Sequence, residues 1–119
     1  MKKHVPITLQ HTSYFDDAVS EFLTQKELTD FCYHLARYPE EGKRIPKGGG
    51  VRKVRWGAKG KGKRGGARVI YYYYDDAIPI LLLDAYPKSD KVKLSDEDLK
   101  ILRQLAHQYR DVWKSKENP

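Results

Sequence analysis

Apolar residues recur along the chain with a period of two or of about 3.6, and each period predicts a type of element. Residues 5–10 alternate as a half-buried strand does. Residues 14–23 have helical spacing and predict a first helix. Residues 24–38 begin with a capping box formed by Thr24 and Glu27 and predict a second helix. The two helices are close in sequence, so we expect a helical hairpin.

The middle of the chain predicts a strand whose two faces differ in chemistry. Residues 51–56 alternate strictly, which places Val54 and Trp56 on one face. Lys53 and Arg55 fall on the other face. One face of this strand is therefore predicted to be cationic.

Two further β-rich stretches, residues 67–74 and 78–86, follow a Gly- and Lys-rich stretch at 57–66 that predicts a long basic hairpin loop. Three consecutive strands predict an antiparallel meander. Ser95 precedes a final stretch of helical periodicity and is its expected N-cap. The element order predicts one α+β domain over residues 1–119, with a small antiparallel sheet, an N-terminal helical hairpin and a C-terminal helix.

Basic residues are concentrated in one part of the sequence. The chain has 23 Lys and Arg against 16 Asp and Glu, a formal net charge of +7. Eleven of these bases lie between Lys43 and Arg68, where no acid occurs. Bases that repel one another do not stabilise a fold, so this stripe predicts an anionic partner, with nucleic acid first among the candidates.

Several other chemistries lack support in the sequence. Residues 60–65 match the pattern G-x-G-x-x-G, yet a β-rich stretch follows where a dinucleotide-binding loop requires a helix. The four histidines are scattered and none has metal-ligand spacing to Cys32, so we expect no metal and no other cofactor. The sequence shows no secretory signal and no apolar run that could span a bilayer, which predicts a cytosolic protein without a membrane partner.

Three sequence blocks carry a resemblance to a known family. They are GGxRKxRW at 49–56, GKGKRGGARVIYYY at 60–73 and AYPKSDKVKLSDED at 85–98. In this order and spacing they resemble the toxins of type II toxin–antitoxin systems in the RelE/HigB superfamily. The resemblance implies a small antiparallel sheet flanked by helices. It also implies an endoribonuclease that enters the ribosomal A site and cuts mRNA, although other toxins of this fold inhibit gyrase.

The resemblance also implies a site. Carried over residue by residue, the catalytic bases fall on Lys53, Arg55, Arg68 and Lys88. Some members have a base-stacking tyrosine where this sequence reads Val-Lys-Leu at 92–94. We expect contacts with RNA or the ribosome from five further bases of the stripe and from three candidate stacking residues: Arg52, Lys59, Lys61, Lys63, Arg64, Tyr72, Tyr74 and Tyr86.

These residue types suit RNA cleavage without a metal. The 2′-hydroxyl of RNA lies beside the scissile phosphate and supplies the nucleophile. Arginines such as Arg55 and Arg68 can stabilise the charge that develops on the phosphate oxygens. The stripe contains no histidine to act as general base. Lys53 is a candidate for that role, because crowding by neighbouring cations disfavours the charged form of an amine.

Three functions stay open on the sequence alone. The first is a ribosome-dependent mRNA endonuclease that inhibits translation, the second a ParE-like toxin that inhibits gyrase, and the third a non-catalytic nucleic-acid-binding protein. The cationic strand face favours the first, because it offers a set of groups that can stabilise a phosphate. A toxin further implies a cognate antitoxin, expected to carry a helix-turn-helix and to make the only sequence-specific contacts with operator DNA.

Overall fold

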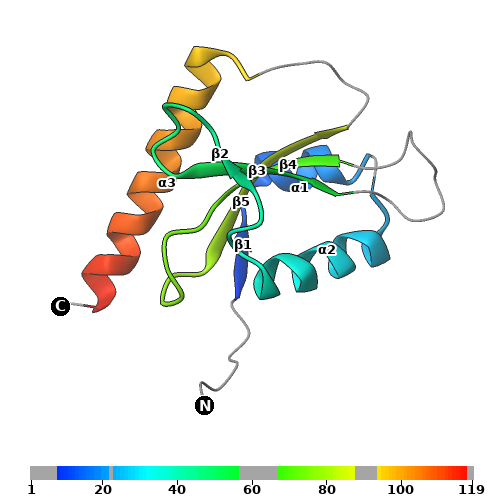
Figure 1. The fold of residues 1–119 in the computed structure, drawn as a ribbon, viewed down its shortest axis with the longest axis horizontal. Helices are drawn as coiled ribbons and strands as arrows, with labels where there is room; N and C mark the ends of the chain where they lie inside the picture. The colour runs from blue at the N-terminus through cyan, green and yellow to red at the C-terminus, as the bar shows by residue number, and fades with distance from the viewer. Residues whose placement is uncertain (1–7, 22, 57–66, 88–93, 118–119) are drawn as a thin grey trace.

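A five-stranded sheet with helices on both faces forms the structure, a computed structural model that describes residues 8–21, 23–56, 67–87 and 94–117. Helix α3 lies along one side of the sheet, and α1 and α2 lie on the other (Figure 1). The elements in chain order are β1 Leu9–His11, α1 Ser13–Val19, α2 Gln25–Arg37, β2 Lys43–Arg44, β3 Val51–Trp56, β4 Ala67–Tyr72, β5 Ile80–Pro87 and α3 Asp96–Glu117.

The sheet confirms the predicted α+β class and the predicted meander. Its strand order is β1-β5-β4-β3-β2, and β3, β4 and β5 pair antiparallel. At one edge β1 pairs with β5 in parallel, so the sheet is mostly rather than wholly antiparallel. At the other edge the two-residue strand β2, which the sequence did not predict, pairs with β3. The first strand was expected at residues 5–10, of which 5–7 lie outside the described residues.

Side-chain caps set the starts of all three helices. The Thr12 hydroxyl accepts a hydrogen bond from the Phe15 N–H at 3.1 Å, and α1 then ends at Val19, earlier than the expected residue 23. Both halves of the predicted capping box are present at α2, with Thr24 and Glu27 bonded at 2.9 and 3.1 Å. Ser95 caps α3 as predicted, accepting from the Asp98 N–H at 3.0 Å.

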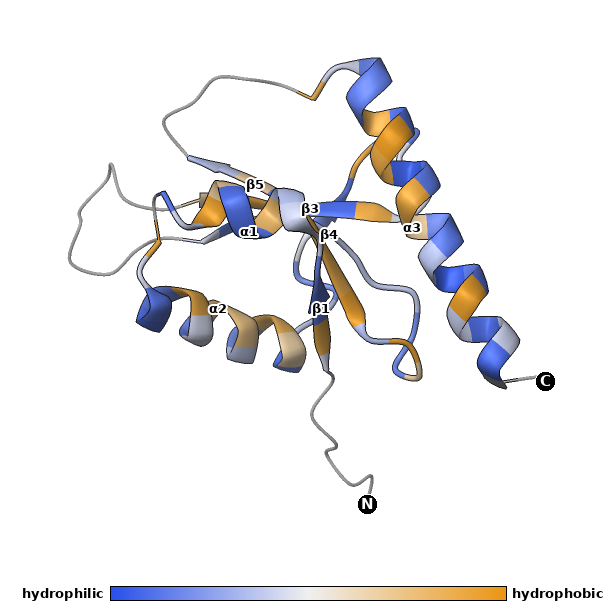
Figure 2. Ribbon diagram, turned by 180° about the vertical axis from the view of Figure 1, so that it is seen from behind, coloured by the Kyte–Doolittle hydropathy of each residue, from blue (hydrophilic) through white to orange (hydrophobic). Residues whose placement is uncertain are grey.

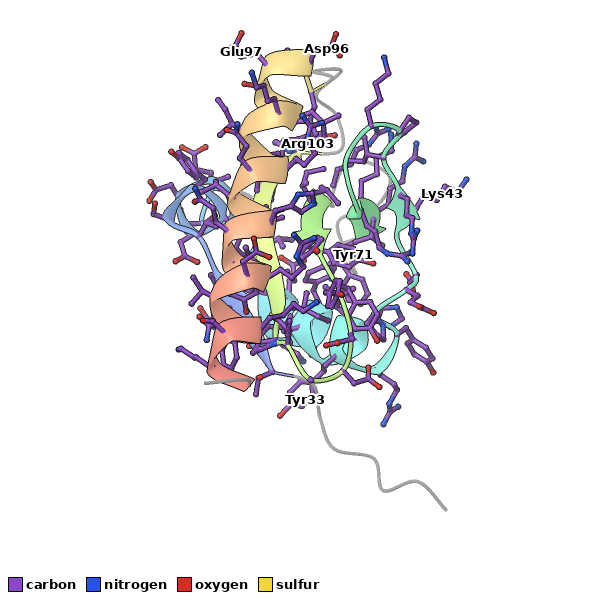
Figure 3. The ribbon with its side chains drawn as sticks, turned by 90° about the vertical axis from the view of Figure 1, so that its left-hand side faces the viewer. Tyr33, Lys43, Tyr71, Asp96, Glu97 and Arg103 are labelled. Atoms are coloured by element: carbon purple, nitrogen blue, oxygen red, sulfur yellow. The ribbon has the colours of Figure 1, made fainter. Side chains whose placement is uncertain are left out.

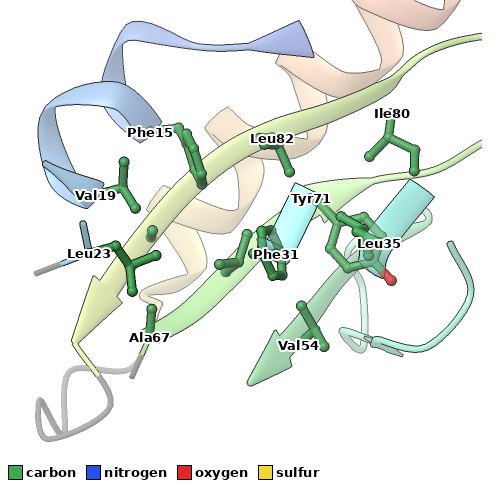
Figure 4. Packing of buried hydrophobic residues seen from close by; sticks show 12 residues of the cluster. Phe15, Val19, Leu23, Phe31, Leu35, Val54, Ala67, Tyr71, Ile80 and Leu82 are labelled. Atoms are coloured by element: carbon green, nitrogen blue, oxygen red, sulfur yellow. The ribbon is translucent and has the colours of Figure 1, made fainter. Parts of the chain in front are cut away.

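The larger apolar cluster lies between the sheet and helices α1 and α2. Phe15 of α1 and Phe31 of α2 are fully buried against Tyr71 and Leu82 of the sheet (Figure 4). Figure 2 shows the matching pattern, with hydrophobic residues concentrated on the strands and on the helix surfaces that face them. Both helices therefore cover the same sheet face.

The smaller cluster lies on the other sheet face, under α3. Leu102 and Ala106 of the helix pack against residues of the sheet that include Val51 and Ile70. Tyr109 adds a hydrogen bond to the Pro79 carbonyl at 2.8 Å. This cluster does not include the C-terminal half of β3, so α3 leaves part of the same face open to solvent.

Candidate active site

Three of the predicted catalytic bases gather on the part of the sheet that α3 leaves open. Arg55 of β3 lies directly opposite Arg68 of β4, and Lys53 lies opposite Ile70. Because side chains alternate along a strand, these registers put all three bases on the face that carries Ile70. They line a cavity of about 630 Å³ together with Glu41, Lys43 and Val54.

The three bases differ in how firmly the protein surrounds them. Lys53 and Arg55 are exposed, whereas Arg68 is partly buried. The Arg68 Nε is fully buried and has no hydrogen-bond partner among the described residues. Because this nitrogen is closed to solvent, a phosphate oxygen would contact the outer guanidinium nitrogens of Arg68 rather than Nε.

Two lining residues, Glu41 and Lys43, were not predicted from the sequence. Lys43 of β2 lies directly opposite Lys53, so the two lysines are on the same sheet face. The Lys43 side chain extends outward from the β2 edge of the sheet (Figure 3). Glu41 precedes β2, and its Oε1 is hydrogen-bonded to Nε2 of His34 on α2. No local pattern marks Glu41, because it lies in the turn-rich stretch between α2 and β3.

The chain segment 39–42, which carries Glu41, is held by two buried polar side chains. The Tyr71 hydroxyl donates to the Pro39 carbonyl at 2.8 Å and accepts from the Gly42 N–H at 2.9 Å. Arg52 Nη1 donates to the carbonyls of Glu40 at 3.2 Å and Gly42 at 2.7 Å. We refer to Tyr71 and Arg52 together as the backbone clamp.

The expectation that Arg52 contacts RNA is corrected by this arrangement. Arg52 is 8% exposed, and its guanidinium is committed to backbone carbonyls on the face that α2 covers. The strict alternation of β3 already indicates the burial of Arg52, because it places Arg52 on the same sheet face as Val54 and Trp56. Lys53 is on the other face.

The structure separates the three tyrosines that were candidates for base stacking. Tyr72 is 2% exposed and packs beside His107 of α3, which corrects the expectation that it stacks on RNA. Tyr74 follows the end of β4 that is remote from Arg68, so it does not reach the cavity. Tyr86 is partly buried and lies directly opposite Arg68, which makes it the one candidate of the three beside the site.

The remaining predicted site residues lie outside the described residues. They are Lys59, Lys61, Lys63, Arg64 and Lys88. Their assignment to RNA binding, and of Lys88 to catalysis, stays a prediction.

A second carboxylate lies on the open face but outside the cavity. Asp84 of β5 is opposite Ile70, and its Oδ1 accepts from the Ala85 N–H at 2.8 Å. Burial raises the pKa of Asp84, and the charge of Asp98 on α3 raises it further. Within the described ranges, no group of three or more His, Cys, Asp or Glu side chains could hold a metal ion, and no helix is long and apolar enough to cross a membrane.

The geometry defines a class: a small α+β protein with a mostly antiparallel sheet and a cluster of bases on one open face. A comparison with known protein families identifies the family to which this class of fold belongs. Residues 17–117 match the family described as the RelE toxin of the RelE/RelB toxin–antitoxin system. The chain therefore belongs to the RelE toxin family and is the toxin of a toxin–antitoxin pair, whose partner is a cognate antitoxin.

Proposed function

We propose that this toxin is a ribosome-dependent endoribonuclease that cuts mRNA in the A site and so stops translation. The observation that carries the proposal is the convergence of Lys53, Arg55 and Arg68 on one solvent-open cavity. Family membership supports it, because mRNA cleavage on the ribosome is the general activity of RelE toxins.

The chemistry requires stabilisation of charge more than any reactive side chain. Attack of the 2′-oxygen on phosphorus forms a 2′,3′-cyclic phosphate and releases a 5′-hydroxyl. Negative charge develops on the non-bridging oxygens during this step, and Arg55 and Arg68 offer guanidinium donors to it. Each fixed donor of this kind typically contributes about 10²–10³ in rate.

The ribosome supplies what the site lacks. Lys53 and Arg55 are exposed, so they do not by themselves hold an RNA backbone in the in-line geometry that attack by the 2′-oxygen needs. An mRNA fixed in the A site arrives with its backbone already oriented. This division of work predicts slow cleavage of free RNA and fast cleavage of ribosome-bound mRNA.

The cognate antitoxin is proposed to neutralise the same cavity. Complementary charge speeds the capture of a basic site, so the nearest antitoxin segment is expected to be acidic or to block access to the ribosome. Operator binding is assigned to a helix-turn-helix in the antitoxin. The toxin alone should bind DNA only loosely and lose that binding steeply with salt.

Induction of the toxin without its antitoxin tests the proposal in cells. Protein synthesis should fall before DNA synthesis, and primer extension should reveal new mRNA 5′ ends within codons. Arg68→Ala should abolish both effects, because it removes a donor at the phosphate while the strand remains paired. An early fall in DNA synthesis with intact mRNA would instead indicate gyrase inhibition.

A further inference from the structure

Proton transfer is the part of the reaction that the three bases do not settle, because Lys53, the candidate base from the sequence, would have to be uncharged to accept a proton. The attacking 2′-hydroxyl must lose a proton, and general base catalysis of such a step contributes about 10²–10⁴ in rate. Protonated lysine and arginine side chains have no lone pair to accept that proton, whereas carboxylates and neutral imidazoles do. The inference that follows rests on the proposed function.

A carboxylate and an imidazole meet at the rim of the cationic cavity. Glu41 lines the cavity, and its Oε1 is hydrogen-bonded to His34 Nε2. The two side chains are 40% and 31% exposed, so solvent and substrate can reach them. We propose that Glu41 accepts the proton of the attacking 2′-hydroxyl and that His34 is the residue that positions its carboxylate.

Hydrogen bonds hold the backbone before and after Glu41. The backbone clamp makes four hydrogen bonds to residues 39–42, the segment on which Glu41 lies. Two buried polar side chains therefore serve to hold one short connection against the sheet. Such rigid support is what a group that must meet a reacting atom requires.

The His34 ring has two aromatic neighbours. The His34 ring lies 5.1 Å from the ring of Trp56 and 5.1 Å from that of Tyr38, measured between centroids. Trp56 in turn packs edge-on against Phe31 of the larger core at 5.4 Å. The hydrogen bond from His34 to Glu41 therefore starts from a ring that the core and α2 keep in place.

Cations predominate among the charged and titratable groups around Glu41. They come from α2, the segment before β2, and strands β2, β3 and β4: His34, Tyr38, Glu40, Lys43, Lys53, Arg55 and Arg68. The cations provide a binding site for the phosphate next to Glu41, the one carboxylate among the described residues that line the cavity. A phosphate bound by these cations would bring the 2′-hydroxyl of the adjoining ribose into a cavity that is lined by both proton donors and a proton acceptor.

The proposed step balances without any further reactant. Glu41 takes the proton from the 2′-hydroxyl as the bond from the 2′-oxygen to phosphorus forms. The bond from phosphorus to the 5′-oxygen breaks, and the protonated amine of Lys53 gives a proton to that oxygen. The products are the 2′,3′-cyclic phosphate and a 5′-hydroxyl, with Glu41 neutral and Lys53 an amine until water restores both.

Single-turnover cleavage of mRNA on programmed ribosomes tests the assignment, with the intact toxin and its Glu41→Gln variant. The amide oxygen of glutamine still accepts a hydrogen bond from His34, so the fold is kept while the basic group is lost. We expect cleavage about 100-fold slower or more. Glu40→Gln removes the same charge one residue away and outside the cavity lining, and should cut at the parent rate.

His34 is tested by a pair of variants. His34→Ala should slow cleavage, and His34→Gln should restore much of the loss because its amide N–H can again donate to Glu41. Parent-like cleavage by His34→Ala would show that Glu41 needs no positioning from this ring.

The outcomes separate the two proposals. A parent toxin that cuts no ribosome-bound mRNA overturns the proposed function and the assignment of Glu41 with it. A parent that cuts, together with a Glu41→Gln variant that cuts equally fast, overturns only the assignment of Glu41.

Discussion

Replacement of Tyr71 by phenylalanine should show how much the hydrogen bonds to residues 39–42 contribute to stability, apart from the packing of the core. The Tyr71 ring is fully buried in the larger cluster, and phenylalanine can fill the same space. Only the hydroxyl is lost, and with it the bonds to the Pro39 carbonyl at 2.8 Å and the Gly42 N–H at 2.9 Å. The change therefore isolates one half of the backbone clamp.

The expected cost follows from these two bonds. A buried hydrogen bond contributes about 1 kcal/mol net, and a donor left unsatisfied costs about 1–3 kcal/mol. The Gly42 N–H is the group left without its partner, because Gly42 is itself buried. We therefore expect Tyr71→Phe to lower the free energy of unfolding by about 2 kcal/mol. For a chain of this size, that loss corresponds to a fall in Tm of about 8 °C.

Urea denaturation at neutral pH measures this loss directly. The midpoint should fall while the slope m stays constant, because the surface exposed on unfolding hardly changes. Tyr33→Phe is the matched control, since it removes the same hydroxyl from a side chain that is 76% exposed. A Tyr71→Phe variant as stable as the control would refute the role assigned to the clamp.

Three further predictions concern stability. Gly42→Ala should lower the free energy of unfolding, measured by urea denaturation, by about 1–3 kcal/mol, because a Cβ there would lie 2.7 Å from Tyr71 and 2.8 Å from the Lys53 carbonyl oxygen. Asp84→Asn should gain up to about 1 kcal/mol at pH 7. Burial raises the pKa of Asp84 above its ordinary value of 3.8, so the folded state favours the protonated carboxyl and loses stability as pH rises through the raised pKa. The stability that Asp84→Asn gains over the parent should therefore vanish when both proteins are titrated to acid pH. Burial also raises the pKa of Tyr109 to about 12, so stability should fall above about pH 10, and Tyr109→Phe should lessen that fall in alkaline melts.

Local sequence signals predicted the elements that depend on local chemistry. The capping box of Thr24 and Glu27 and the Ser95 cap located two helix starts, because a cap is a contact between residues three positions apart. The alternation of 51–56 located β3 and the cationic face of Lys53 and Arg55. These features require no knowledge of distant parts of the chain.

Features set by distant parts of the chain could not be predicted in the same way. The parallel pairing of β1 with β5 and the short strand β2 depend on partners that no local period encodes. Alternation assigns Tyr72 to a face, but only the placement of α3 decides that this face is covered there. The bond between His34 and Glu41 joins α2 to the connection before β2, and neither residue is distinctive alone.

Cleavage of a labelled mRNA by the purified toxin tests the central claim most directly. The reaction should be run with the mRNA free and with the same mRNA held in the A site of programmed ribosomes, for the parent and for Arg68→Ala. We expect rapid cleavage only on the ribosome, a 2′,3′-cyclic phosphate on the 5′ fragment, and loss of activity in the variant. Intact mRNA in the presence of the parent toxin, or equal cleavage by Arg68→Ala, would contradict the proposed function.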